Sequence, residues 1–148
     1  MSLLSIKFEK IISSSEEQQA ILFELLKKRK HNISNKIIPT KKQHNKFVIN
    51  NPYRAWYLIK QGEVYIGTTY ILDNNCLGFF ALTQEDIVLP KALKFILQKY
   101  KPLKEIKSIR PKNFYINVSP DNNILETQLR ILGAEKIQTT FSLDAVYS

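Results

Sequence analysis

The most informative segment of this 148-residue chain is residues 117–143, N-V-S-P-D-N-N-I-L-E-T-Q-L-R-I-L-G-A-E-K-I-Q-T-T-F-S-L. It overlaps the run Phe114 to Val118, whose alternation predicts a strand. Ser119 is the expected cap of the next helix, because its hydroxyl can accept a bond from a free backbone amide. Pro120 suits the first helical position, where an N–H is not needed. The segment therefore begins with a strand that leads into a helix.

The remainder of the segment predicts that helix, its end and one more strand. Leu125, Leu129 and Leu132 recur at helical spacing and are expected to face the core. Gly133 follows them, where the left-handed backbone that ends a helix favours glycine. Residues Ile137 to Leu143 are predicted to form a closing strand.

The N-terminal third of the chain predicts one strand and two helices. Leu3 to Ile12 alternates well enough to indicate a strand. Ser13 to Glu17 has the pattern of a capping box, and the helix that follows ends in the basic run Lys27 to Lys30, which suits the helix dipole. Thr40 to Ile49 opens with a second capping box, T-K-K-Q, and is predicted to form a short helix.

The middle of the chain predicts a β-meander followed by a helix. Aromatic and β-branched residues dominate three runs, which are Arg54–Ile59, Val64–Leu72 and Cys76–Leu82. A helix follows from about Val88 to Tyr100, with Pro90 in its first turn. The complete order is β-α-α-β-β-β-α-β-α-β. This order predicts a mixed α/β (α+β) fold, with helices packed on a mostly antiparallel sheet in one domain spanning residues 1–148.

The composition, with 44% apolar and 24% charged residues, is that of a globular domain. Cys76 is the single cysteine, which excludes an internal disulfide, and with only two histidines we expect no metal site. No apolar run reaches the roughly 20 residues that span a bilayer. Met1 to Phe8 lacks the pattern of a signal peptide, so the expected compartment is the cytoplasm.

The formal charge of +9, from 22 Lys and Arg against 13 Asp and Glu, favours anionic partners. Nucleic acid, anionic lipid and a phosphorylated small molecule all fit this charge. The chain is also rich in Lys, Asn and Ile together, so the charge is equally explained as a compositional bias without functional meaning.

The element order and the C-terminal segment resemble the GCN5-related N-acetyltransferase (GNAT) superfamily over residues 53–143. Asn122 falls on an Asn that opens the fourth helix of that superfamily, and Leu132-Gly133 on its Leu-Gly turn. Residues 51–59 are similar to the second strand of bacterial members. The resemblance implies transfer of an acyl group from acyl-coenzyme A (acyl-CoA) to an amine.

Two positions depart from the family pattern. The family's cofactor loop reads Gln/Arg-x-x-Gly-x-Gly/Ala, and its glycines let backbone amides surround a pyrophosphate. The corresponding residues Glu85 to Pro90 contain no glycine, and Glu85 and Asp86 place negative charge there. Leu129 stands where many members have a Tyr that protonates the leaving thiolate.

The resemblance implies a set of residues for binding acetyl-CoA at the end of the fourth strand and the start of the third and fourth helices. They are Leu82, Thr83, Val88, Leu89, Lys91, Lys94 and Asn122. Leu82 and Thr83 would offer backbone groups to the pantetheine arm. Lys91 and Lys94 would bind phosphates as point charges, or they simply form a solvated helix face.

The catalytic candidates are Glu85, Tyr115 and Asn117. Glu85 is placed to deprotonate an ammonium group through water, or it is a carboxylate favoured by the helix dipole. Tyr115 and Asn117 share one strand face, where they either orient an amine or form a half-buried polar surface. Aromatic candidates for contacts with the acceptor substrate are Tyr53, Trp56, Tyr57 and Phe80, and their alternative role is in the core.

Three functional hypotheses follow. The first is N-acetyl transfer from acetyl-CoA to a primary amine of a small molecule such as an amino sugar, by a protein that is compatible with a homodimer and has no membrane partner. The second is a degenerate GNAT-fold binding or scaffolding module. The third is a nucleic-acid binder that uses Lys27 to Lys46, although no nucleic-acid motif is present. His44 on this stretch is interpreted as a surface histidine, with a general base as the alternative.

Overall fold

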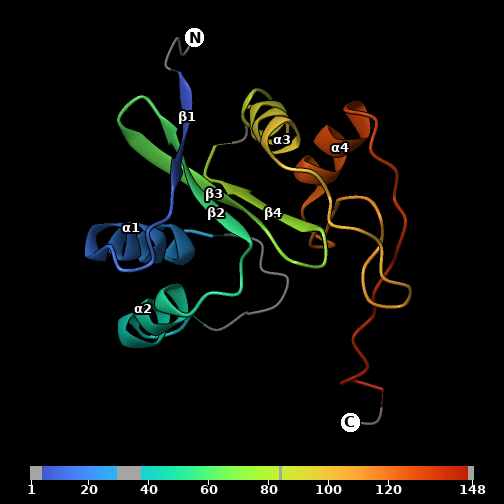
Figure 1. Ribbon diagram of the computed structural model, residues 1–148, viewed down its shortest axis with the longest axis horizontal. Helices are drawn as coiled ribbons and strands as arrows, with labels where there is room; N and C mark the ends of the chain where they lie inside the picture. The colour runs from blue at the N-terminus through green and yellow to red at the C-terminus, as the bar shows by residue number, and fades with distance from the viewer. Residues whose placement is uncertain (1–4, 30–37, 84, 147–148) are drawn as a thin grey trace.

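The computed structural model describes residues 5–29, 38–83 and 85–146, which form a five-stranded sheet and four helices (Figure 1). The strands are β1 Ile6–Lys10, β2 Ala55–Gln61, β3 Val64–Ile71, β4 Cys76–Ala81 and β5 Tyr115–Ile116. The helices are α1 Glu16–Lys27, α2 Lys41–Ile49, α3 Val88–Lys99 and α4 Asn123–Ile131. Leu3 and Leu4 of the predicted first strand lie outside the described residues, as do residues 30–37 of the basic stretch.

The strands lie in the order β1-β2-β3-β4-β5, and every pair is antiparallel except β4 with β5, which is parallel. A parallel pair needs a crossover connection, which α3 and residues 100–114 supply. The predicted fold class, a mixed α/β (α+β) layer with a mostly antiparallel sheet and flanking helices, is confirmed.

The side chains on the two faces of β2 pack against different helices, because successive side chains of a strand point to opposite sides. One cluster packs on α1 and α2, and its buried members are Leu22, Leu25, Val48, Trp56 and Leu58. The other packs on α3, and its buried members are Ala55, Tyr57, Ile71, Leu77 and Ile96. The sheet therefore lies between α1 with α2 on one face and α3 on the other (Figure 1).

Local capping contacts fix the ends of the helices as the sequence predicts. Ser15 caps α1, and its hydroxyl accepts a bond from the Gln18 N–H at 3.2 Å. Thr40 and Gln43 form the predicted capping box, with each side chain accepting a bond from the backbone N–H of the other residue. Gly133 follows α4 with a φ of 95°, the left-handed conformation expected at a helix end.

The predicted cap of α4 at Ser119 is wrong. Asn122 caps this helix instead, and its Oδ1 accepts a bond from the Leu125 N–H at 3.2 Å. Ser119 Oγ is bonded to the carboxylate of Asp121, so the chain makes a turn before the helix begins. Pro120 accordingly lies in that turn rather than at the first helical position.

The closing strand predicted at Ile137 to Leu143 does not form. Residues 131–146 are all exposed, and Ile137, Phe141 and Leu143 are 74%, 81% and 70% exposed. None of the five described strands pairs with this segment, so the backbone hydrogen bonds that define a strand are absent. In Figure 1 it runs as an extended tail along one side of the molecule and ends away from the sheet.

The interpretation of His44 as a surface residue is also wrong. His44 is 6% exposed on the inner side of α2, with its ring 5.4 Å from the ring of Phe23. Its Nδ1 has no hydrogen-bond partner among the described residues. Burial lowers the pKa of His44, because the low-dielectric surroundings disfavour the charged imidazolium.

This burial predicts a pH-dependent stability. The unfolded chain binds a proton at His44 more readily than the folded chain does. The contribution of the buried neutral imidazole to the free energy of unfolding is therefore complete above the ordinary pKa of 6.5, and it is lost as the pH falls through the lowered pKa. We expect the Tm to drop between about pH 7 and pH 5, and the drop to be smaller in His44→Leu. Thermal unfolding followed by circular dichroism checks this, and equal slopes for the two proteins would contradict it.

Candidate functional site

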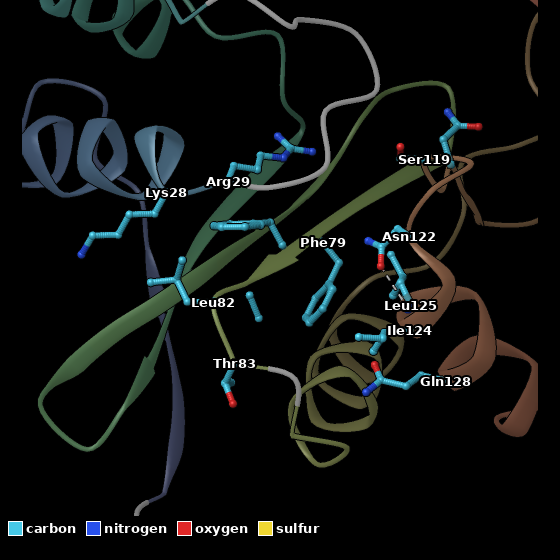
Figure 2. Close-up of a pocket in the computed structure, with 13 residues that line it drawn as sticks. Lys28, Arg29, Phe79, Leu82, Thr83, Ser119, Asn122, Ile124, Leu125 and Gln128 are labelled. Atoms are coloured by element: carbon cyan, nitrogen blue, oxygen red, sulfur yellow. Dashed lines mark hydrogen bonds between the residues drawn. The ribbon is translucent and has the colours of Figure 1, made fainter.

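The site is built where β4 and β5 separate. The two strands pair only through Cys76 with Tyr115 and Leu77 with Ile116, and β4 then continues to Ala81 without a described neighbour on that side. A pocket opens beside this stretch of β4 (Figure 2). It is lined by Lys28, Arg29, Phe79, Phe80, Ala81, Leu82, Thr83, Asn117, Ser119, Asn122, Ile124, Leu125 and Gln128.

The register of β3 and β4 determines which backbone groups face the pocket. Leu82 N–H donates to the Ile66 carbonyl on β3 at 2.7 Å. Hydrogen-bonded residues alternate along an antiparallel pair, so the even-numbered residues of β4 bond to β3. The N–H and C=O groups of Phe79 and Ala81 therefore point to the side on which β5 has ended. The Leu82 amide, which the sequence suggested as a pantetheine contact, is already used within the sheet.

The N-terminal part of α4 forms one flank of the pocket. Asn122 stands at its start, and Gln128 Nε2 donates to Asp86 Oδ1 at 3.2 Å, which ties α4 to the loop before α3. Asn117 precedes this helix, and its Nδ2 donates to the Cys76 sulfur at 3.5 Å. Burial raises the pKa of the Cys76 thiol, so this group stays protonated and is not an activated nucleophile.

The opposite flank comes from the end of α1 and is basic. The Arg29 guanidinium lies 5.6 Å from the centre of the Phe80 ring, within the range of a cation–π contact. Figure 2 shows Arg29 reaching from α1 over the strand toward the α4 side, whereas Lys28 points away from α4. The pocket therefore has an uncharged polar flank on α4 and a cationic flank on α1.

The structure brings some of the predicted site residues together and not others. The pocket lining includes Phe80, Leu82, Thr83, Asn117 and Asn122. The predicted residues outside the lining are Tyr53, Trp56, Tyr57, Glu85, Val88, Leu89, Lys91, Lys94 and Tyr115. Sequence reasoning did not assign Lys28, Arg29 or Gln128 to the site. The basic helix end was visible in the sequence, but nothing there indicated that it faces β4.

Of the predicted aromatic residues, Tyr53 and Trp56 lie in one cluster with ring centres 4.7 Å apart, whereas Tyr57 lies on the other face of the sheet. Trp56 is buried on the α1 and α2 side, where its Nε1 donates to Thr68 Oγ1 at 2.8 Å. Tyr57 is buried on the opposite face, with its hydroxyl bonded to the Tyr100 hydroxyl. Tyr53 stacks on Tyr70 with ring centres 4.1 Å apart. These contacts place the three rings in packing roles.

The residues around the start of α3 divide into buried and exposed groups. Val88 and Leu89 are each 1% exposed, so their side chains belong to the core. The predicted phosphate-binding residues Lys91 and Lys94 are exposed on the helix. Glu85 is also exposed, and its Oε2 accepts a bond from Gln61 Nε2 at 3.3 Å.

The described part of the chain holds no group of three or more His, Cys, Asp or Glu residues arranged to bind a metal ion. None of its helices is long and apolar enough to cross a membrane.

A test of the α4 flank is the variant Asn122→Ala. Loss of the cap leaves an amide of the first turn without its partner, so we expect the free energy of unfolding to fall by about 1 kcal/mol. Urea denaturation of the variant and of Asn122→Asp, which keeps a capping oxygen, checks this. An equal loss in both variants would contradict the capping role.

A scan against protein-family models finds no match for this chain, and a search of curated proteins finds no similar sequence. Among solved structures, the chain is similar to an aminoglycoside N-acetyltransferase, AAC(6')-Iy, in complex with CoA. The TM-score is 0.58, and the match covers 94% of this chain and 93% of that chain. The sequences are 12% identical, so the likeness concerns the fold. With its element order, the separating β4 and β5 strands and this likeness, the chain has the fold of the GCN5-related N-acetyltransferases.

Proposed function

We propose that this protein is an N-acetyltransferase that moves an acyl group from acyl-CoA to a primary amine of a small molecule. The observation that carries the proposal is the pocket beside the unpaired edge of β4, where backbone groups of Phe79 and Ala81 face an open space. The likeness in fold to an acetyltransferase that holds CoA supports the same function.

The pocket suits the pantetheine arm of the cosubstrate. This arm carries two amide groups, and an extended chain of amides can bond to a strand edge in place of a neighbouring strand. Phe79 and Ala81 supply the matching N–H and C=O groups. The phosphates would lie toward α3, where Lys91 and Lys94 supply positive charge but no glycine loop is present.

The chemical step follows from these groups. A neutral amine attacks the thioester carbon, and a backbone N–H of β4 stabilises the negative charge that develops on the carbonyl oxygen. The tetrahedral intermediate then collapses, the C–S bond breaks, and the CoA thiolate takes a proton. Leu129 is buried in the core and cannot donate this proton, so we assign the role to water.

The acceptor and its contacts complete the proposal. We propose an amino sugar or related amine, and the similar protein, which by its name acetylates a small-molecule amine, supports an acceptor of this general class. Asn117 lines the pocket and is the residue best placed to orient the amine. Glu85 and Tyr115 both lie outside the pocket lining. Because Glu85 does not line the pocket, it would take the proton of the amine through a water molecule rather than directly. We further propose a single domain located in the cytoplasm.

An activity assay tests this function. The protein is incubated with acetyl-CoA and a panel of primary amines that includes glucosamine, and the release of CoA thiol is measured. We expect release that depends on the amine. Acetyl-CoA binding without amine-dependent release from any member of the panel would contradict the enzyme assignment.

The second candidate function is a GNAT-fold binding module without catalysis. Two observations favour it: Leu129 occupies the position of the family's general acid, and residues 85–90 lack glycine. Such a module would bind acetyl-CoA, or a ligand of another kind, without transferring an acyl group. The activity assay separates the two candidates.

A further inference from the structure

The positive charge of the chain is concentrated in one stretch. Residues 27–54 hold nine of the 22 Lys and Arg residues and none of the 13 Asp and Glu residues. The remaining residues hold 13 of each sign, so this stretch accounts for the whole excess of +9. A uniform compositional bias would spread the excess along the chain, and the segregation therefore calls for a local explanation.

The start of this stretch forms the basic flank of the pocket. Lys28 and Arg29 line it, and none of the thirteen lining residues in the described chain is Asp or Glu. The neighbouring Lys27 is paired with Glu24 at 2.8 Å, so its charge is offset. Arg29 is partly buried and held over Phe80, which positions its guanidinium at the pocket.

Under the proposed function, the acceptor amine rather than the cosubstrate would contact the basic flank formed by Lys28 and Arg29. The cosubstrate would extend from the edge of β4 toward α3 and α4, so the α1 side is where an amine would approach the thioester. A cationic wall attracts anions and repels cations, and a like-charge contact across a binding surface costs several kcal/mol. A polycation, such as an aminoglycoside with several ammonium groups, is therefore a poor match for this pocket.

We propose that the acceptor is a small amine that also carries an anionic group, a phosphate or a carboxylate, and that Arg29 binds this group. The inference rests on the proposed function and narrows its substrate class. A guanidinium is suited to both anions, because its planar donors match two oxygens of either group.

The experiment measures the binding of four probes to protein that is saturated with CoA. The probes are O-phosphoethanolamine, β-alanine, ethanolamine and the polycation kanamycin. We expect at least one of the two anionic amines to bind about tenfold or more tightly than ethanolamine, and kanamycin to bind least. The tighter of the two anionic probes identifies the phosphate or the carboxylate as the preferred group.

Two variants assign the effect to Arg29. Arg29→Gln should abolish the preference for the anionic probe, whereas Lys42→Gln removes one charge from the exposed face of α2 and should keep it. The proposal is overturned if no anionic probe binds, if kanamycin or ethanolamine binds as tightly, or if the preference survives in Arg29→Gln. A tenfold loss of acetyl-CoA affinity in that variant would also overturn it, because Arg29 would then bind the cofactor.

Failure of the proposed function is distinguished by acetyl-CoA itself. If the wild-type protein does not bind acetyl-CoA, the acyltransferase proposal fails on its own. The four probes are then titrated into the free protein, and the same comparison with Arg29→Gln still decides whether Arg29 forms an anion site.

Discussion

Under the proposed function, replacing Ala81 by proline is expected to lower the rate of acetyl transfer about 100-fold, because it removes the backbone N–H that we propose contacts the cosubstrate. The register places this N–H on the side of β4 away from β3, so its loss leaves the bonds between β3 and β4 in place. Proline also restricts the preceding residue to extended backbone, which Phe80 already has within the strand. The expected loss therefore reflects the site rather than the fold.

The measurement is the steady-state rate of CoA release with the best acceptor of the panel. Ala81→Ser is the matched control, because it changes the side chain and keeps the N–H. Unfolding curves of both variants establish that the fold is retained. A rate for Ala81→Pro within a few-fold of Ala81→Ser would contradict the role of this amide.

Replacing Gly67 by alanine is expected to destabilise the protein by about 3 kcal/mol or more. A Cβ at this position would lie 2.0 Å from the Phe80 carbonyl oxygen and 2.9 Å from Ala81 Cα. Both atoms belong to the backbone of β4, so no side-chain rotation relieves the contact. The strand that forms the floor of the pocket must shift instead.

Urea denaturation at a single pH measures the loss of stability. Val64→Ala is the control on the same strand, and since Val64 is 60% exposed we expect a change within about 0.5 kcal/mol. Equal stabilities of Gly67→Ala and Val64→Ala would show that β3 and β4 do not approach as closely as the contact distances require.

The sequence was most informative where structure depends on neighbours within a few residues. The capping box at Thr40 and Gln43 and the left-handed Gly133 follow from local backbone chemistry, and both are confirmed. Ser119 was a misleading signal, because its hydroxyl can bond either a helix amide or the nearby Asp121, and the sequence does not distinguish the two.

Long-range contacts account for what could not be predicted. His44 lies on a lysine-rich helix, and only the approach of Phe23 from α1 reveals that its side chain is buried. The sequence indicates only that Arg29 belongs to a basic helix end, and its place at the pocket is visible only from its contact with the Phe80 ring. The alternation at residues 137–143 predicted a strand, but a strand also needs backbone hydrogen bonds to a neighbour, and no described strand pairs with this segment.

The candidate site was predicted in part for the same reason. Asn117 was proposed from its place on one face of a predicted strand and Asn122 from the family resemblance, and both line the pocket. Trp56 and Tyr57 are adjacent in sequence and lie on opposite faces of the sheet, so a single aromatic surface was never available to them.

The most direct test of the account is a calorimetric titration of the protein with acetyl-CoA at low and at moderate salt. We predict saturable binding of one molecule per chain in the micromolar range, retained at moderate salt because backbone groups of β4 supply part of the affinity. The absence of binding heat, or binding that moderate salt abolishes, would reduce the interaction to attraction by a basic surface and would contradict an acyl-CoA site between β4 and β5.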